Sequence, residues 1–319
     1  MALSIFNSER RVQLTILSAI VVTVPLALLN FATHVNLSRG KGGTDAERNF
    51  WQYKLRPSEK YDIVCLGDSR TLMGINPEFL EIELHCKAYN ASFAAGSLNE
   101  VIFQHIDNNF LSRIPGRPKA VVIGLTPLTM GQDSRNNALF ESTKLELEKK
   151  RFSVIDNFEQ VFFKKIRSKH IKRLFKKTSE TKVYHKNGHL ERFAKVRKKA
   201  QLSGLRFYDI YLAKYKFSQQ SKKEMLTRIK AWTREGITVF VFRPPVNASM
   251  DKLENKSKKI NFASMRKQIE AAGGVWIEIE DRSSYNSYDS SHLSSEEARR
   301  FSKYLARKIG DYYRQNLPK

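Results

Sequence analysis

Three residues in two distant segments have the side chains that nucleophilic catalysis needs. Ser69 follows the apolar run 61–67 within the sequence Gly-Asp-Ser-Arg, just before residues typical of a helix start. Asp289 and His292 form an Asp-Ser-Ser-His segment near the C-terminus. A serine hydroxyl is a weak nucleophile without a base. The three-residue spacing lets one loop present both side chains, so that the carboxylate holds the imidazole while its other nitrogen faces Ser69.

The elements that must position these residues are short strands and amphipathic helices in alternation. Five apolar runs predict strands, namely 61–67, 86–91, 119–124, 237–242 and 275–279. Four segments with helical spacing lie between or after them, namely 77–84, 97–111, 219–234 and 294–315. The alternation predicts an α/β doubly wound parallel sheet. Both candidate segments follow strands, so we expect them to meet at the carboxyl edge of that sheet.

The segments IVCLGDSR and YDSSHLS, in this order, resemble the two main sequence blocks of the SGNH/GDSL hydrolase superfamily. The resemblance implies a three-layer α/β/α flavodoxin-like parallel sheet. It also implies that Ser69 is the nucleophile, His292 the base and Asp289 the residue that orients the base. The alternative is that Ser69 is only a helix cap and that Asp289 and His292 form a hydrogen-bonded pair within a loop.

The resemblance also indicates candidates for the oxyanion site and for substrate binding. The segment 90–96 corresponds to the second family block and implies Gly96 as an oxyanion donor. The third block has an asparagine that this chain lacks, and Thr126, or a group from the inserted segment described below, is the candidate replacement. Arg243 follows the fourth predicted strand and would hold a phosphate or carboxylate; the alternative is a surface salt bridge.

The N-terminal segment predicts a compartment for the protein. Residues 12–35 contain no charged side chain and are long enough to cross a bilayer. Arg10 and Arg11 predict that residues 1–11 are cytoplasmic and that the body is extracytoplasmic, either periplasmic or at the cell surface. A cleaved signal peptide and a buried core helix are the alternatives. Residues 36–59 are interpreted as a polar linker and 60–319 as the SGNH-like domain.

Composition and charge narrow the possible partners. The 319 residues carry a net charge of +24, with 41% hydrophobic and 28% charged residues, which excludes a disordered chain and a multi-span membrane protein. Two cysteines exclude a disulfide-dense scaffold and a four-cysteine zinc site. The positive charge predicts an anionic partner. An extracytoplasmic body argues against nucleic acid and favours a cell-surface glycan, an anionic polymer or lipid.

Most of the excess charge lies in one segment. Residues 131–217 are interpreted as a basic helical insertion, since residues 164–199 alone contain fifteen Lys and Arg and two Glu. Aromatic residues interleave with these charges, namely Phe162, Phe163, Phe175, Tyr184 and Phe193. The segment is expected to bind an anionic polymer or lipid head groups. The alternative is a solvated face that keeps the domain soluble.

The cysteines and histidines predict no metal or cofactor. Cys65 and Cys86 fall on neighbouring predicted strands and are interpreted as buried free thiols rather than a disulfide. His185 and His189 have the i, i+4 spacing of a helical metal pair, but Lys-Asn-Gly lies between them and predicts a turn. We therefore expect no metal site and no cofactor.

A single membrane helix followed by an SGNH domain resembles the layout of accessory proteins of cell-surface acylation. These include the D-alanyl transfer protein of lipoteichoic acid and alginate O-acetylation proteins, which work beside a polytopic membrane O-acyltransferase. The resemblance implies a membrane-anchored serine esterase or O-acyltransferase acting on acetyl or similar esters of a glycan through an acyl-enzyme. The alternatives are a lipid esterase at the membrane surface and a non-catalytic scaffold for anionic polymers.

Overall fold

The computed structural model describes residues 45–94, 98–111, 119–132, 138–149 and 181–316. The chain divides into two units, and the larger one, Phe50–Leu145 with Ser179–Lys319, contains the central sheet and the candidate site. The predicted membrane segment 12–35 lies outside the described residues. Among the residues that are described, no helix is long and apolar enough to cross a membrane.

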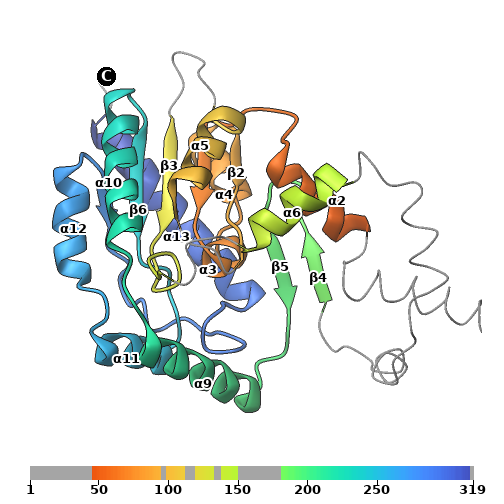
Figure 1. The fold of residues 1–319 in the computed structure, drawn as a ribbon, viewed down its shortest axis with the longest axis vertical. Helices are drawn as coiled ribbons and strands as arrows, with labels where there is room; N and C mark the ends of the chain where they lie inside the picture. Colours follow the sequence, from red (N-terminus) through yellow and green to blue (C-terminus); the bar gives the residue numbers. More distant parts are fainter. Residues whose placement is uncertain (1–44, 95–97, 112–118, 133–137, 150–180, 317–319) are drawn as a thin grey trace, which may run out of the picture. The chain divides into compact units, whose positions relative to one another are not determined.

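A parallel five-stranded sheet forms the centre of this unit (Figure 1). Its strands are β1 (Ile63–Leu66), β2 (Ala88–Asn90), β3 (Ala120–Gly124), β6 (Thr238–Phe242) and β7 (Val275–Ile277). The order β2-β1-β3-β6-β7 is that of a doubly wound sheet, in which the winding direction reverses between β1 and β3. The predicted α/β parallel sheet is confirmed, and each predicted apolar run contains one of these strands.

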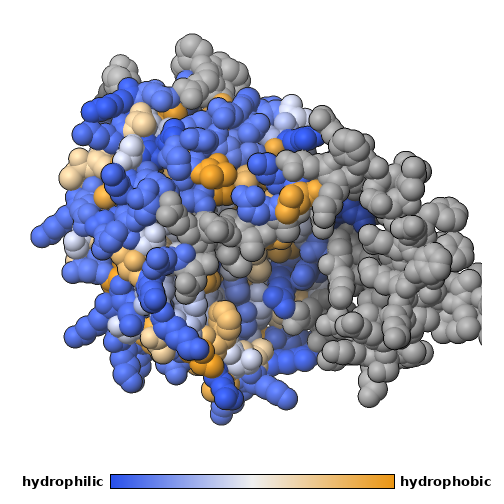
Figure 2. All heavy atoms as spheres, viewed as in Figure 1, coloured by the Kyte–Doolittle hydropathy of each residue, from blue (hydrophilic) through white to orange (hydrophobic). Residues whose placement is uncertain are grey.

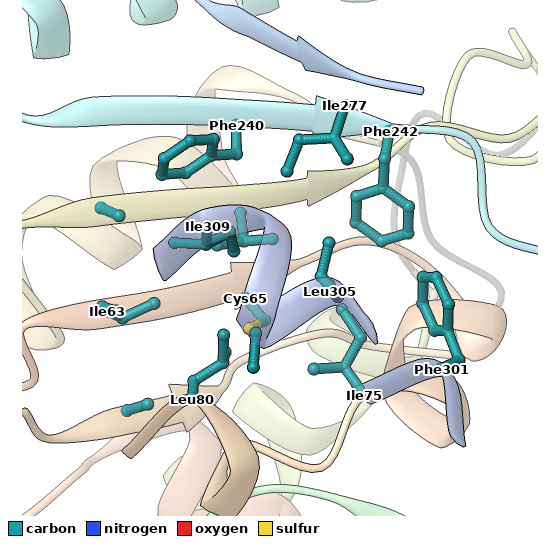
Figure 3. Close-up of a cluster of buried hydrophobic side chains, with 14 of the residues drawn as sticks. Ile63, Cys65, Ile75, Leu80, Phe240, Phe242, Ile277, Phe301, Leu305 and Ile309 are labelled. Atoms are coloured by element: carbon teal, nitrogen blue, oxygen red, sulfur yellow. The ribbon is translucent and has the colours of Figure 1, made fainter. Parts of the chain in front are cut away.

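Helices cover both faces of the sheet because its strands are apolar on both sides. One face packs against α4 (Glu78–Leu84) and α13 (Ser295–Asn316), and Leu305 and Ile309 of α13 lie over Cys65 of β1 (Figure 3). The other helices near the sheet are α5 (Glu100–Asn109), α10 (Gln219–Arg234) and α12 (Phe262–Ala271). Phe103 of α5 and Trp232 of α10 pack edge to face in this layer.

The two cysteines are free and buried, as predicted. Cys65 is fully buried on β1, and burial raises the pKa of its thiol to about 12. A thiol with so high a pKa is protonated at neutral pH and is a poor nucleophile. Both cysteines are therefore part of the apolar core, and neither is a candidate for the reaction chemistry.

The predicted linker 36–59 contains a helix, α2 (Asp45–Leu55). Lys54 has no exposed surface, and its ammonium lies over the rings of Phe50 and Tyr89. It donates hydrogen bonds to the backbone carbonyls of Asn90 and Gly188. Burial holds the pKa of Lys54 well below its usual value. The polar composition of the segment concealed this helix, because a charged residue occupies its most buried position.

The inserted segment is only partly helical in the described residues. It contains α6 (Ala138–Lys149) and α9 (Lys198–Lys214), but also an antiparallel hairpin of β4 (Thr181–Tyr184) and β5 (Leu190–Phe193). Gly188 has a positive φ of 82° in the hairpin turn, which a glycine adopts without strain. The turn predicted between His185 and His189 is confirmed, whereas the helical interpretation of these residues was wrong.

The last helix begins with a serine cap. The hydroxyl of Ser294 accepts the backbone N–H of Glu297 at 3.3 Å. The Glu297 carboxylate does not return to the backbone of Ser294 but pairs with Arg300 at 2.8 Å. The serine cap positions the start of α13 directly after the segment that contains Asp289 and His292.

Candidate active site

Ser69 is the first residue of α3 (Ser69–Gly74), which follows β1 after a two-residue turn. Asp68 caps the helix by accepting the backbone N–H of Arg70 at 2.9 Å. Gly67 permits the tight turn, because a Cβ there would lie 2.1 Å from the Thr71 hydroxyl oxygen. The backbone N–H of Ser69 lies in the first turn of the helix, where intrahelical acceptors are lacking. The serine is thereby held at the carboxyl edge of the sheet.

Asn90 fixes the other end of this short helix from β2. Its side-chain amide donates hydrogen bonds of 2.9 Å to the carbonyls of both Thr71 and Ile75. The last carbonyls of a helix lack intrahelical donors, so this amide supplies a donor to Ile75 and adds a second one to Thr71, whose carbonyl also accepts the Ile75 N–H at 3.1 Å. Asn90 is fully buried and therefore positions α3, and with it Ser69, relative to the sheet.

The structure brings the three sequence-predicted residues together. Nε2 of His292 lies 2.7 Å from Oγ of Ser69, and Nδ1 of His292 lies 2.8 Å from Oδ2 of Asp289. The other carboxylate oxygen of Asp289 accepts the backbone N–H groups of His292 at 2.8 Å and Ser291 at 3.1 Å. This is the geometry of a nucleophile, a base and a residue that orients the base.

The surroundings of Asp289 keep its carboxylate ionised. Burial alone would raise its pKa, but the hydrogen bonds from the His292 ring and from the backbone N–H groups of His292 and Ser291 outweigh burial and lower the pKa below its usual value. An ionised carboxylate accepts the Nδ1–H of the imidazole and leaves Nε2 free to accept the Ser69 proton. The pair therefore favours His292 as a general base.

Tyr288 and Arg192 support the imidazole from one side, and the sequence analysis did not identify them. The Tyr288 ring stacks on the His292 ring with centroids 5.7 Å apart and an interplanar angle of 14°. Arg192 of β5 lies over the Tyr288 ring and donates a 3.0 Å hydrogen bond to its hydroxyl. The hairpin of the inserted segment thus contacts the base through one aromatic ring.

Helix α9 holds the loop that carries Asp289 and His292. The Gln201 side chain donates to the Ser287 carbonyl at 2.9 Å, and the Ser290 hydroxyl donates to the Gln201 carbonyl at 3.1 Å. Gly204 faces the loop so closely that a Cβ there would lie 1.9 Å from the carbonyl oxygen of Asp289. The inserted segment is therefore part of the framework of the site.

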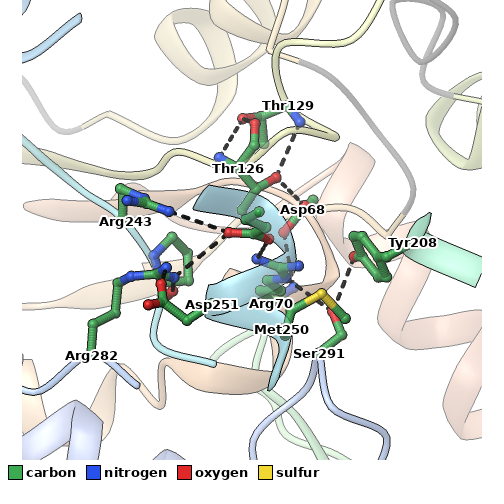
Figure 4. A network of polar contacts seen from close by, with 12 residues as sticks. Asp68, Arg70, Thr126, Thr129, Tyr208, Arg243, Met250, Asp251, Arg282 and Ser291 are labelled. Carbon is green, nitrogen blue, oxygen red and sulfur yellow. Dashed lines mark hydrogen bonds and ion pairs between the residues drawn. The ribbon is translucent and has the colours of Figure 1, made fainter. Parts of the chain in front are cut away.

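A buried ionic network links Ser69's helix to the same loop (Figure 4). Arg70 pairs with Glu254 of α11 (Ala248–Ser257) at 2.6 Å, and both side chains are buried. Arg70 also donates to the Ser291 hydroxyl at 3.0 Å, which in turn donates to Tyr208 of α9 at 3.0 Å. Burial alone would lower the pKa of Arg70, but the attraction of Glu254 outweighs it and raises that pKa. Arg70 therefore remains charged and joins α3, α9, α11 and the loop.

Arg243 belongs to this network and not to the surface. It lies over the Phe262 ring and 3.4 Å from Glu254, with 18% of its side chain exposed. Arg282 also contacts Glu254, at 3.8 Å, and pairs with Asp251. Burial, followed by repulsion from the other arginines, lowers the pKa of Arg282 to about 8. The carboxylate that Arg243 contacts here is one of the protein's own, that of Glu254, and its role in binding a substrate anion stays a prediction.

Thr126, which the sequence suggested as the replacement oxyanion donor, lies beside the turn that precedes Ser69. Its hydroxyl donates to Asp68 at 2.5 Å, and its backbone N–H donates to the Thr129 hydroxyl at 2.9 Å. Both donors are therefore engaged in fixing the turn before Ser69. Gly96, the other predicted donor, lies outside the described residues.

The remaining histidines of the hairpin have protein partners. His185 pairs with Glu191 at 2.9 Å, and His189 lies 3.2 Å from the Leu72 carbonyl. Burial, and then the proximity of His185, lowers the pKa of His189 to about 4. Across the described part of the chain, no group of three or more His, Cys, Asp or Glu residues is arranged to hold a metal ion.

Comparison with known proteins adds no family assignment. No protein-family model matches the chain, and no curated protein matches it significantly.

Proposed function

We propose that this protein is a serine esterase or O-acyltransferase in which Ser69, His292 and Asp289 form the catalytic triad. One observation carries the proposal, namely the continuous pair of hydrogen bonds from Ser69 to His292 and from His292 to Asp289. The position of Ser69 at a strand-to-helix turn, with its hydroxyl beside the base, supports the same chemistry.

In the proposed reaction, Oγ of Ser69 attacks the acyl carbonyl while Nε2 of His292 takes the hydroxyl proton. Asp289 stabilises the imidazolium that forms. The Ser69 N–H is directed to the developing oxyanion, with Gly96 as the second donor implied by the family resemblance. His292 then returns the proton to the leaving oxygen, which leaves an ester on Ser69. Water or a hydroxyl acceptor attacks that ester in a second step, with His292 again acting as the base.

We further propose an acetyl or similarly small acyl ester of a cell-surface glycan as the substrate. This part rests on the resemblance in layout to cell-surface acylation proteins, with residues 12–35 as a membrane anchor and a polytopic O-acyltransferase as partner. On this proposal the catalytic domain is extracytoplasmic.

Rapid mixing with p-nitrophenyl acetate, followed by mass spectrometry of the quenched protein, tests the proposal. We expect a burst of nitrophenol and an acetyl group on the peptide that contains Ser69, since an acyl-enzyme forms before it is hydrolysed. S69A and H292A should each lower the rate by roughly 10⁴-fold or more. S249A, which changes an exposed serine on α11, is the matched control. Equal turnover by S69A and wild type would contradict the proposal.

A further inference from the structure

The outer face of α9 combines large apolar side chains with positive charge. Leu202, Phe207 and Ile210 are 57%, 59% and 52% exposed, although residues of this size are usually buried. Leu202, Arg206 and Ile210 are spaced four residues apart and so lie along one side of the helix. Figure 2 shows apolar residues set among hydrophilic ones over the region of α9.

Positive side chains surround these apolar residues. Between residues 194 and 217, Asp209 is the one acidic residue, against seven exposed basic residues, namely Lys195, Arg197, Lys198, Lys199, Arg206, Lys214 and Lys216. Within the described part of the chain, no carboxylate pairs with Lys198, Lys199 or Arg206. The face therefore has both unburied apolar area and uncompensated charge.

A groove between α9 and α11 continues this face. It has a volume of about 380 Å³ and is lined by two leucines, three basic residues, one acidic residue and one serine, namely Leu205, Leu253, Arg206, Lys252, Lys256, Asp209 and Ser249. Leu205 and Leu253 are partly buried against the core of the domain. The groove thus repeats the combination of apolar and basic groups found on the exposed side of α9.

We propose that this face, defined as the outer side of α9 with the α9–α11 groove, docks on an anionic lipid bilayer. A bilayer interface takes apolar side chains into the boundary between head groups and acyl chains, and its anionic head groups attract Lys and Arg at the same depth. A second copy of the chain fits poorly, because two such faces would place like charges against each other. Phe207 is the one aromatic ring among the three exposed apolar residues, and the aliphatic Leu202 and Ile210 offer no stacking platform to the bases of a nucleic acid.

The docking face lies on the side of α9 opposite the side that contacts the loop carrying Asp289 and His292. Gln201 and Gly204 contact that loop from the inner side of α9, while Leu202 points outward. Bilayer contact would therefore hold the candidate site close to the membrane surface. Docking on lipid is independent of the proposed enzyme activity, and contact with lipid can be measured alone.

An environment-sensitive fluorophore on the full-length protein tests the proposal. The variant L202C can be labelled selectively with a nitrobenzoxadiazole maleimide, because both native cysteines are buried. We expect a blue shift and increased emission with vesicles of phosphatidylcholine and phosphatidylglycerol, and no change with phosphatidylcholine alone. High salt should reverse the response, since it screens exposed charges. The same label at I82C, an exposed position on α4, should not respond.

Charge variants separate this face from the general positive charge of the protein. The triple variant K198E/K199E/R206E should weaken the response at position 202 by roughly 100-fold in lipid concentration, since each basic residue near such a surface contributes about fivefold. The matched triple variant K223E/K230E/R234E on α10 removes the same charge and should leave the response unchanged.

Three results would overturn the proposal. The first is equal response at position 202 to anionic and neutral vesicles, and the second is an equal response at position 82. The third is a spectral change with duplex DNA and none with anionic vesicles, which would assign the face to nucleic acid.

Discussion

Substitution of Gly204 by alanine tests the structural role of α9 at the candidate site. A Cβ at this position would lie 1.9 Å from the carbonyl oxygen of Asp289 and 3.1 Å from its carbonyl carbon. Non-bonded carbon and oxygen atoms need roughly 3.3 Å, so the helix and the loop must separate by more than ~1 Å. No side-chain rotation relieves the overlap, because the obstacle is backbone.

G204A should lower the stability of the fold by little but should slow the reaction at Ser69 strongly. Overpacking lowers the free energy of unfolding by about 1–3 kcal/mol, whereas the better helix propensity of alanine raises it by about 1 kcal/mol. The net loss of stability should therefore be about 2 kcal/mol or less. A displacement of ~1 Å within the catalytic geometry, however, costs roughly 100-fold in rate. We therefore expect a folded variant with a strongly reduced rate of reaction at Ser69.

The assay is the second-order rate of fluorophosphonate labelling, measured together with urea denaturation. The matched control is G310A in α13, whose Cβ would meet the Glu83 carboxylate at 2.8 Å, a partly exposed side chain that can move away. That variant should keep the full labelling rate and gain up to about 1 kcal/mol. A G204A variant that labels at the wild-type rate and is more stable than wild type would refute the reasoning about α9.

Three further predictions concern single residues. D289N should lower the labelling rate at Ser69 by roughly 10²–10⁴-fold with little change in the urea midpoint, because the amide holds the wrong imidazole tautomer. E254Q removes the carboxylate charge that faces the buried Arg70 and the partly buried Arg243 and Arg282, and it should destabilise the fold by about 3–5 kcal/mol. E280Q at an exposed pair should shift the urea midpoint little. The pKa of His189 is about 4 in the folded protein, against the usual 6.5. As the pH falls from 6.5 to 4, the unfolded chain therefore takes up a proton that the folded protein does not. The free energy of unfolding should fall by about 3 kcal/mol over that range. H189Q should remove this dependence in urea titrations at a series of pH values.

The sequence was sufficient for the sheet and for the three central residues of the site because each depends on local patterns. Strands buried on both faces appear as continuous apolar runs, and in a doubly wound sheet the segments after the strands meet at one edge. Ser69 and His292 could therefore be paired across more than 200 residues without knowledge of the packing.

The supporting groups could not be predicted, because their roles depend on long-range contacts. Arg70, Glu254 and Tyr208 are ordinary surface residues by composition, and only the packing of α3, α11 and α9 buries them together. Thr126 was considered as an oxyanion donor from its place in the chain, but Asp68 and Thr129 engage its donors. The helix around Lys54 escaped detection for the same reason, since burial of its charge depends on carbonyls supplied by two distant segments.

Fluorophosphonate labelling of the full-length protein, with the modified residue located by mass spectrometry, tests the central claim most directly. The geometry of Ser69 and His292 predicts one adduct, on Ser69, that is absent from S69A and strongly slowed in H292A. A folded wild-type protein that forms no adduct, or that is modified at another serine while Ser69 stays unmodified, would contradict an activated serine at this site.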